Sequence, residues 1–371
     1  MADILFITEA LLAWAFLTII QIPLRKKEHR IIGSAVFVLK IILIPLVALL
    51  FVAADWVTGY AYAGITCAFY VALIADVMAS AVEFAVRMIR ARNDDKEKRH
   101  AFDHRVGTPV SLVICVAVLA FGTVTAGTVG MATHEWQADG LTDTHTFAFA
   151  SDIHAGSDQS MDVLRKFCGQ VNSSGAEFLI LGGDITDEYT TYDRMLETYG
   201  ILSTVSIPVY LVMGNHDRQL YSYYTGGRTY TDAQLLDAID SAGIKLLSDE
   251  FVLVDTDLVL LGREDVSAGD ARKAWSELSN PHPGKTLIVA DHQPYDKDQL
   301  KAEVSALQLS GHTHAGQLWP LQTIYNLLGY PAYGEFDYPG TRLYVSPGLN
   351  GWAPPMRTEV HCGWELISLH P

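Results

Sequence analysis

The stretch Phe178-Leu-Ile-Leu-Gly-Gly-Asp-Ile-Thr-Asp187 decides the fold of the second two thirds of the chain. Its first four residues are apolar, which favours a short buried strand. Two glycines then allow close approach of the backbone just before the carboxylate of Asp184. A strand that ends in glycine and a potential metal ligand is typical of a binding loop at the edge of an α/β sheet.

Four other predicted strands end in the same kind of polar cluster. They are Thr146–Ala150 before Ser151-Asp-Ile-His154, Val209–Met213 before Gly214-Asn-His-Asp217, Thr286–Ala290 before Asp291-His-Gln-Pro294, and Leu307–Leu309 before Gly311-His-Thr-His314. Binding crevices in open α/β sheets lie beyond the carboxyl ends of the strands. We therefore expect the five clusters to converge in space.

Apolar and amphipathic runs alternate along the rest of this region, which indicates a sheet layered with helices. Further strands are predicted over Phe251–Val254, Leu258–Leu261 and Leu343–Val345, the first two joined by a hairpin turn at Asp255-Thr-Asp257. Helices are predicted over Asp162–Val171, Tyr192–Leu202, Asp232–Ala242, Ala271–Leu278 and Lys297–Val304. The predicted fold is an α/β domain, a layered β-sandwich flanked by helices.

The ligand types in these clusters point to divalent transition metals, because such ions accept both carboxylate and imidazole ligands. In Asp152-x-His154 and in His312-x-His314 the spacing of two places both side chains on one face of an extended segment. A carboxylate can also bridge two ions about 3.5–4 Å apart, an arrangement that suits phosphoryl transfer. Asp184, preceded by two glycines, suits the bridging position.

These motifs resemble the calcineurin-like metallophosphoesterase superfamily in residue type and order, over roughly Thr144 to Leu369. The matching residues are Asp152-x-His154, Gly183-Asp184-x-x-Asp187, Gly214-Asn215-His216-Asp217, His292 and Gly311-His312-x-His314. Gly311-His-Thr-His-Ala-Gly-Gln317 and Ser346-Pro-Gly-Leu349 look like the membrane-associated bacterial branch similar to YkuE. Ala315 departs from that branch, which usually has a second glycine there.

The resemblance implies two divalent metal ions, most simply Mn²⁺, with Fe or Zn²⁺ as alternatives. One ion would be held by Asp152, His154, Asp184 and His314. The other would be held by Asp184, Asn215, His292 and His312, with Asp184 as the bridge. A metal-bridging hydroxide would attack phosphorus, His216 would stabilise charge on the phosphoryl oxygens or protonate the leaving group, and Asp217 would orient His216. Asp187 would fix the turn around Asp184.

Three further residues are weaker candidates for contact with substrate. Arg218 follows the His216–Asp217 pair and is either a phosphate contact or a solvated loop arginine. Arg357 is either an anion contact or a structural partner. Trp319 lies in an apolar, aromatic segment directly after a ligand loop, where it contacts either lipid or the protein core.

The first third of the chain predicts a membrane region. Four stretches approach the roughly 20 apolar residues that a helix needs to cross a bilayer. They are Ile4–Leu24, Ile31–Val52, Tyr60–Val82 and Val110–Met131. Lys and Arg concentrate between the first and second stretches and between the third and fourth, so the positive-inside rule places both of these loops in the cytoplasm. A multi-pass protein then has its N-terminus and its catalytic domain on the non-cytoplasmic side. Asp76, inside the third stretch, receives no predicted role.

Charge excludes one class of partner. The chain has a net charge of −16, and the residues after Ala132 carry the whole negative excess. Nucleic acid is therefore not an expected partner, because its phosphates require a basic face. The four cysteines are widely spaced and give no disulfide framework.

The sequence thus predicts three parts: a four-helix transmembrane region over 1–132, a connector over 133–143 and a metallophosphoesterase domain over 144–371. The predicted function is a membrane-anchored dinuclear phosphoesterase whose substrate is a phosphorylated small molecule or a lipid-linked phosphate, with membrane lipid as its surroundings. One alternative is a nucleotide–lipid pyrophosphohydrolase of the UDP-diacylglucosamine type. Another is a non-catalytic membrane receptor or transport component with a phosphoesterase fold.

Overall fold

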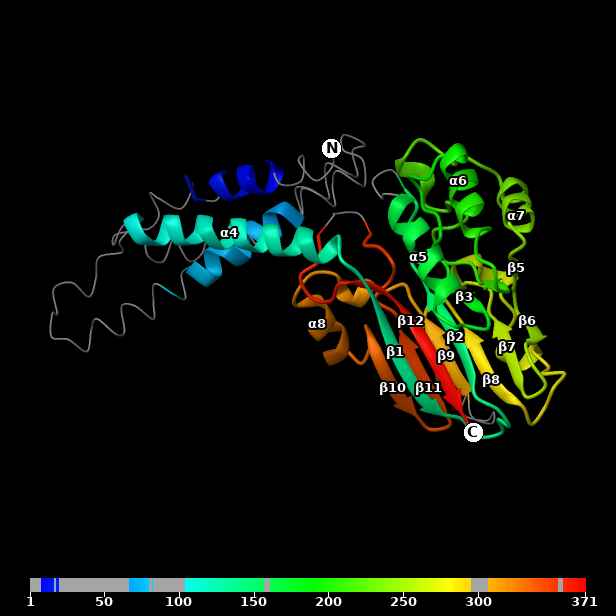
Figure 1. The fold of residues 1–371 in the computed structure, drawn as a ribbon. Coiled ribbons are helices and arrows are strands. Elements are labelled where there is room, and N and C mark those ends of the chain that lie inside the picture. The colour runs from blue at the N-terminus through cyan, green and yellow to red at the C-terminus, as the bar shows by residue number, and fades with distance from the viewer. Residues whose placement is uncertain are drawn as a thin grey trace. The chain divides into compact units, whose positions relative to one another are not determined.

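The computed structural model describes residues 8–16, 18–19, 67–79, 82, 104–156, 161–294, 306–352 and 356–371. The chain divides into two compact units. The first comprises Met1–Val124 with Ala353–Met356, and the second comprises Thr125–Trp352 with Arg357–Pro371. Figure 1 shows the described elements of both units.

The described residues of the first unit are mainly helical. They include a helix around residues 8–19, the apolar helix Cys67–Ala79, and α4 over His104–Ala126, whose last two residues belong to the second unit. Within the described ranges, one helix is long and apolar enough to cross a membrane, over Pro109–Ala126 with a mean hydropathy of 2.2.

The four predicted spans are therefore not confirmed as a set. Ile31–Val52 lies outside the described residues, and Ile4–Leu24 and Tyr60–Val82 are described only in part. The fourth span is shorter than predicted, because α4 ends at Ala126 and a strand begins at Val129.

Asp76 is buried and joins three helices of the first unit through a short chain of hydrogen bonds. The indole Nε1 of Trp14 donates to Ser111 Oγ at 2.9 Å, and this hydroxyl donates to Asp76 Oδ1 at 2.8 Å. The carboxylate thus has a partner for helix packing, in keeping with its lack of a predicted functional role.

The second unit contains two six-stranded sheets with mixed strand directions. The first has the order β1-β12-β2-β3-β4-β5 and the second has the order β10-β11-β9-β8-β7-β6. The first sheet comprises β1 Val129–Gln137, β12 Cys362–His370, β2 His145–Ala150, β3 Leu179–Leu181, β4 Val209–Leu211 and β5 Lys245–Leu246. The second comprises β10 Gly334–Tyr338, β11 Thr341–Val345, β9 Ala306–Ser310, β8 Thr286–Ala290, β7 Leu258–Gly262 and β6 Glu250–Leu253.

Strands β2 to β5 are parallel in the first sheet, and β7, β8, β9 and β11 are parallel in the second. The helices of this unit are α5 Met161–Ser173, α6 Tyr192–Leu202, α7 Asp232–Ser241 and α8 Leu321–Leu327. Short 3₁₀ turns occur at Ser222–Tyr224, Val266–Ala271, Trp275–Glu277 and His314–Gly316. The predicted α/β architecture of sheets with flanking helices is confirmed.

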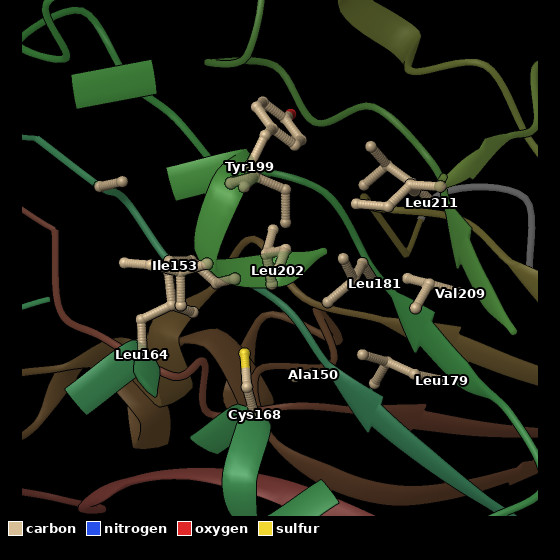
Figure 2. Close-up of a cluster of buried hydrophobic side chains, with 14 of the residues drawn as sticks. Ala150, Ile153, Leu164, Cys168, Leu179, Leu181, Tyr199, Leu202, Val209 and Leu211 are labelled. Atoms are coloured by element: carbon tan, nitrogen blue, oxygen red, sulfur yellow. The ribbon is translucent and has the colours of Figure 1, made fainter. Parts of the chain in front are cut away.

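Alternation along each strand builds two main cores. Ala148 and Ala150 of β2 pack with apolar residues of α5 and α6, whereas Phe147 and Phe149 point the other way, into the core that both sheets share. Figure 2 shows the helix-facing core, where Leu164 and Cys168 of α5 lie near side chains of β3 and α6. The strands that carry the site are therefore buried on both faces.

The residues predicted as a polar connector instead begin the domain. Thr133–Gln137 belongs to β1, which pairs with β12 in parallel from Val129–Cys362 to Gln137–His370. The prediction of a connector over 133–143 is wrong for this part. Because the side chains of β1 here are mostly exposed and few are apolar, the sequence carries little strand pattern. An edge strand with one partner needs little apolar pattern, since its backbone hydrogen bonds supply the pairing.

Several predicted elements agree closely with the structure. Tyr192–Leu202 and Thr286–Ala290 have the predicted bounds, and the hairpin at Asp255–Asp257 is confirmed by the antiparallel pairing of β6 with β7. The helix predicted over Ala271–Leu278 is wrong, because this region forms two short 3₁₀ turns. The helix predicted over Lys297–Val304 lies outside the described residues.

A polar link joins the two sheets at the end of β2 opposite to its carboxyl end. His145 Nε2 bonds Asp257 Oδ1 at 2.9 Å, and its Nδ1 bonds Glu177 Oε2 at 3.0 Å. The other Asp257 oxygen accepts from the amide and the hydroxyl of Thr142, each at 2.6 Å. The hairpin of the second sheet is thereby held to the first sheet.

Replacing Asp257 with Asn should lower the free energy of unfolding by about 1–3 kcal/mol, because charged hydrogen bonds are lost. Burial lowers the pKa of His145, but Glu177 and Asp257 outweigh it and raise this pKa above 6.5. The stabilisation is therefore complete below pH 6.5 and is lost as pH rises through the raised pKa of the folded state. Denaturation of the full chain in detergent across this range measures it; the exposed Asp237→Asn on α7 is the control. Equal stability of the two variants would refute the link.

Candidate metal centre

Five loops of the second unit meet at one place, as predicted from the strand ends. They follow β2, β3, β4, β8 and β9, and they bring together two groups of potential ligands. The first group is Asp152, His154 and His314, and the second is Asp184, His292 and His312. Within each group one ligand atom from every residue lies within 4.8 Å of the others.

Most of these ligands sit in an unusual backbone conformation. Positive φ angles of 43–71° occur at Asp152, His154, Asp184, His312 and His314. Left-handed backbone is uncommon outside glycine, and such residues gather at functional sites where the surrounding fold holds them. The backbone thus turns the side chains away from a strand direction and toward a common point.

In the first group the imidazoles face each other. His154 Nε2 and His314 Nε2 are 3.2 Å apart, and Asp152 Oδ1 lies 3.5 Å from His314 Nε2 and 3.9 Å from His154 Nε2. All three side chains are buried. Two ring nitrogens that converge with a carboxylate oxygen form a cradle that suits a cation.

The second group is assembled around Asn215. His312 Nδ1 lies 2.9 Å and His292 Nε2 lies 3.2 Å from Asn215 Oδ1. Asp184 Oδ2 completes the group at 3.0 Å from His292 Nε2. The same oxygen lies 3.7 Å from His154 Nε2 in the first group. Asp184 therefore lies between the two groups, at the position predicted for a bridge.

Hydrogen bonds to the opposite ring nitrogens fix two of the imidazoles. His292 Nδ1 donates to Gly182 O at 2.8 Å, and His314 Nδ1 donates to Asn350 O at 3.1 Å. Each ring thus presents Nε2 to the site. Burial lowers the pKa of His314 to about 3 and that of His312 to about 4. Both rings are neutral at pH 7 and can offer a lone pair to a metal.

The donor set fits two divalent cations. Buried carboxylates of Asp152 and Asp184 lie among imidazoles and one amide oxygen, the mixed nitrogen and oxygen ligation that divalent transition metals accept. Buried anions need compensating positive charge. The two groups share one carboxylate, so the arrangement suits a pair of ions rather than two separate sites.

The partner of the His216 ring is Glu188, which the sequence did not reveal. His216 Nδ1 bonds Glu188 Oε2 at 2.6 Å, and the carboxylate is fully buried. Burial lowers the pKa of His216, but Asp184 and Glu188 outweigh it and raise this pKa to about 9. Because Nδ1 is committed to Glu188, Nε2 is the ring nitrogen that a substrate can use.

Asp217 has a different task from the predicted one. Its Oδ2 accepts the amides of Asp184 at 2.9 Å and of Gly214 at 2.7 Å, and its Oδ1 accepts the amide of Ile185 at 2.8 Å. The prediction that Asp217 orients His216 is corrected: Asp217 instead joins the loop after β3 to the loop after β4. It thereby holds Asp184 in place through the backbone.

Asp187 lies where the prediction put it, next to the turn that follows Asp184. Its Oδ1 accepts from the amide of Tyr189 and from the hydroxyl of Thr190, and its Oδ2 is 3.6 Å from His154 Nδ1. Asp187 therefore supports both the turn and the outer side of one ligand ring.

Part of the chain matches a known protein family. The family model described as calcineurin-like phosphoesterase matches residues 145–316. The matched region contains every predicted metal ligand and His216. Over residues 145–316 the chain is similar to calcineurin-like phosphoesterases.

Several curated proteins that are similar to this chain are named as metallophosphoesterases. An uncharacterized metallophosphoesterase of Helicobacter pylori is 30% identical over 56% of this chain and 55% of its own length. A transmembrane protein with metallophosphoesterase domain of Bos taurus is 31% identical over 56% of this chain and 49% of its own. An uncharacterized metallophosphoesterase of Campylobacter jejuni is 26% identical over 80% of this chain and 76% of its own. The match to the first two spans about half of their length.

Both arginine candidates have hydrogen-bond partners within the second unit. Arg218 makes a two-pronged bond to Glu264, with both N–O distances at 2.8 Å. Arg357 is fully buried and donates to the carbonyls of Pro347 and Asn350. Neither guanidinium is left for a phosphate, so for both residues the structural alternative fits better than anion contact.

Trp319 is exposed, so it does not pack in the protein core, which was the alternative to lipid contact. Two aromatic rings instead flank His216: Tyr221 at a centroid distance of 5.7 Å and Trp352 at 5.8 Å. The sequence contained a signal for the first in its run of tyrosines near Gly226. It contained none for Trp352, which comes from a loop more than a hundred residues after His216.

Adding a methyl group at Gly183 should dismantle the centre. This residue has a φ of 90°, and a Cβ there would lie 2.7 Å from Gly214 N and 2.8 Å from His292 Nδ1. We expect Gly183→Ala to bind less than one metal ion per chain where the parent binds two, as measured by elemental analysis after dialysis. Gly200→Ala on α6, where a Cβ meets nothing within 4 Å, is the matched control. Full metal content in Gly183→Ala would contradict the packing argument.

Proposed function

We propose that this chain is a membrane-attached phosphoesterase that depends on two divalent metal ions and hydrolyses a phosphate ester, with a lipid-linked phosphate as its substrate. The observation that carries the proposal is the pair of ligand groups joined at Asp184, with the imidazole of His216 and its partner Glu188 beside them. Mn²⁺ is the proposed metal, and Fe and Zn²⁺ are the alternatives for reconstitution.

The chain's own residues divide the work. When bound, the two ions would polarise the phosphoryl oxygens and supply an activated water. His216 would act as the general acid, passing its Nε2 proton to the leaving oxygen as the P–O bond breaks. Glu188 keeps that ring oriented through Nδ1, and the amide of His216 donates to Asp184 Oδ1 at 2.8 Å. The acid and the bridging ligand are thus connected directly.

Membrane attachment is supported by α4 and by relatives named as transmembrane proteins. We propose the multi-pass topology with the N-terminus and the catalytic domain on the non-cytoplasmic side, on the basis of the basic loops in the sequence. A cytoplasmic nucleotide-linked substrate is disfavoured by that orientation. The complete ligand set and the His216–Glu188 pair likewise disfavour a non-catalytic receptor.

Two variants of the full chain test the assigned roles. His216→Ala should lose at least about 100-fold in turnover, the range for loss of a general acid, yet retain both metal ions. Asp184→Asn should lose turnover together with metal, because an amide has neither the negative charge nor the second oxygen with which the carboxylate would serve both ions. Hydrolysis of a monoester, a diester and a lipid pyrophosphate, alongside elemental analysis, measures both effects. Full activity in either variant would overturn the assignment.

Glu188→Gln tests the second half of the acid pair. An amide can still occupy the space but removes the negative charge that favours the imidazolium. We expect kcat to fall about 10-fold or more with little change in metal content, and the alkaline limb of the pH–rate profile to move to lower pH. Glu188→Asp should recover part of the rate. An unchanged pH profile in Glu188→Gln would show that Glu188 serves packing alone.

A further inference from the structure

The segment after the last ligand loop forms an exposed apolar surface on the second unit. This α8 surface comprises Trp319, Leu321, Ile324, Leu327 and Leu328. Leu327 and Leu328 are 81% and 76% exposed, and α8 has no buried residue. Scattered apolar side chains on a surface are ordinary, but a contiguous group on one short helix marks a contact site.

The composition of this segment favours a lipid contact over a protein surface. Leu318–Leu328 contains no charged residue. It includes a tryptophan and a tyrosine, the residue types enriched where a bilayer meets water. The other polar residues of the segment, Gln322, Thr323 and Asn326, are uncharged.

The α8 surface is tied to the place where α4 enters the second unit. Gln317 O accepts the amide of Thr358 at 2.9 Å, and Thr358 Oγ1 accepts the amide of Trp319 at 2.8 Å. The chain then runs directly into β12, whose first residue Cys362 donates its thiol to Ala126 O at 3.3 Å. Ala126 is the last residue of α4.

We propose that the α8 surface contacts the lipid bilayer beside the end of α4. The inference rests on the membrane attachment in the proposed function, because α4 is the candidate span. A helix that crosses the bilayer and ends near Ala126 brings this part of the domain to the headgroup region. An uncharged surface there buries its apolar side chains at the boundary between headgroups and acyl chains.

The proposed bilayer contact also concerns the substrate, because the loop that leads into α8 contacts Trp352 beside the metal centre. Gln317 donates to Trp352 O and accepts from Trp352 N, each at 3.0 Å. The Trp352 ring lies 5.8 Å from the His216 ring, centroid to centroid. A bilayer at the α8 surface therefore lies near the aromatic wall of the site, which suits a phosphate ester whose apolar part stays in the membrane.

Spin labels on single introduced cysteines test the contact in the full chain. The four native cysteines are buried, so labelling is directed to the new positions. Leu327→Cys reports on the α8 surface, Val113→Cys on exposed α4, and Leu236→Cys on exposed α7. In vesicles of phosphatidylcholine and phosphatidylglycerol, the labels at 327 and 113 should collide more with oxygen than with a water-soluble nickel chelate. The label at 236 should do the reverse.

The outcomes distinguish failure of the α8 contact from failure of membrane attachment. In one outcome the label at 113 lies in lipid, while the label at 327 collides with the nickel chelate as often as the label at 236. Membrane attachment then stands and the α8 contact is refuted. Shielding of 327 from both oxygen and nickel would also refute it, because a protein would then cover the surface. A water-exposed label at 113 would overturn membrane attachment and the α8 contact together, whatever the hydrolysis assay shows.

Discussion

The candidate metal centre depends on one buried carboxylate placed between two groups of imidazoles. Asp184 Oδ2 faces His292 at 3.0 Å and His154 at 3.7 Å, while Oδ1 accepts the amide of His216. Burial alone raises the pKa of Asp184, but the surrounding imidazoles hold it well below its usual range. The compensation comes from loops of both sheets, so the shared core must hold those loops in register for the anion to be tolerated.

The loops are held mainly through backbone contacts. Asp217 gathers the amides of two loops on one side chain, and Gly183 and Gly214 permit those loops to approach closer than any side chain allows. Buried polar groups of this kind are costly when half satisfied and stabilising when complete. The glycine and aspartate positions are therefore as constrained as the metal ligands, although neither glycine offers a ligand atom.

The sequence predicted the parts of the fold and site that local pattern encodes. Alternating strands and helices follow from periodicity, and strand ends with polar residues follow from the geometry of α/β sheets. The sequence did not predict β1, because its side chains are mostly exposed and its pairing depends on β12 at the far end of the chain. Glu188 was equally hidden: its role depends on the direction of a turn that brings it to His216, which neighbouring residues do not encode. The family resemblance implies that Asp217 orients His216, yet its carboxylate accepts backbone amides rather than a bond from the ring.

The last ligand loop connects the chemistry of the site to the outer surface. His314, Ala315, Gly316 and Gln317 all have positive φ, a conformation that costs of order 1–3 kcal/mol at each non-glycine residue unless neighbours hold it. The holding groups lie on both sides: Asn350 and Arg357 brace His314 from within, and Thr358 bonds the backbone of Gln317 from the side of α8. The contacts that fix the metal ligand His314 and those that hold the segment leading into α8 therefore lie in one loop with a positive-φ backbone.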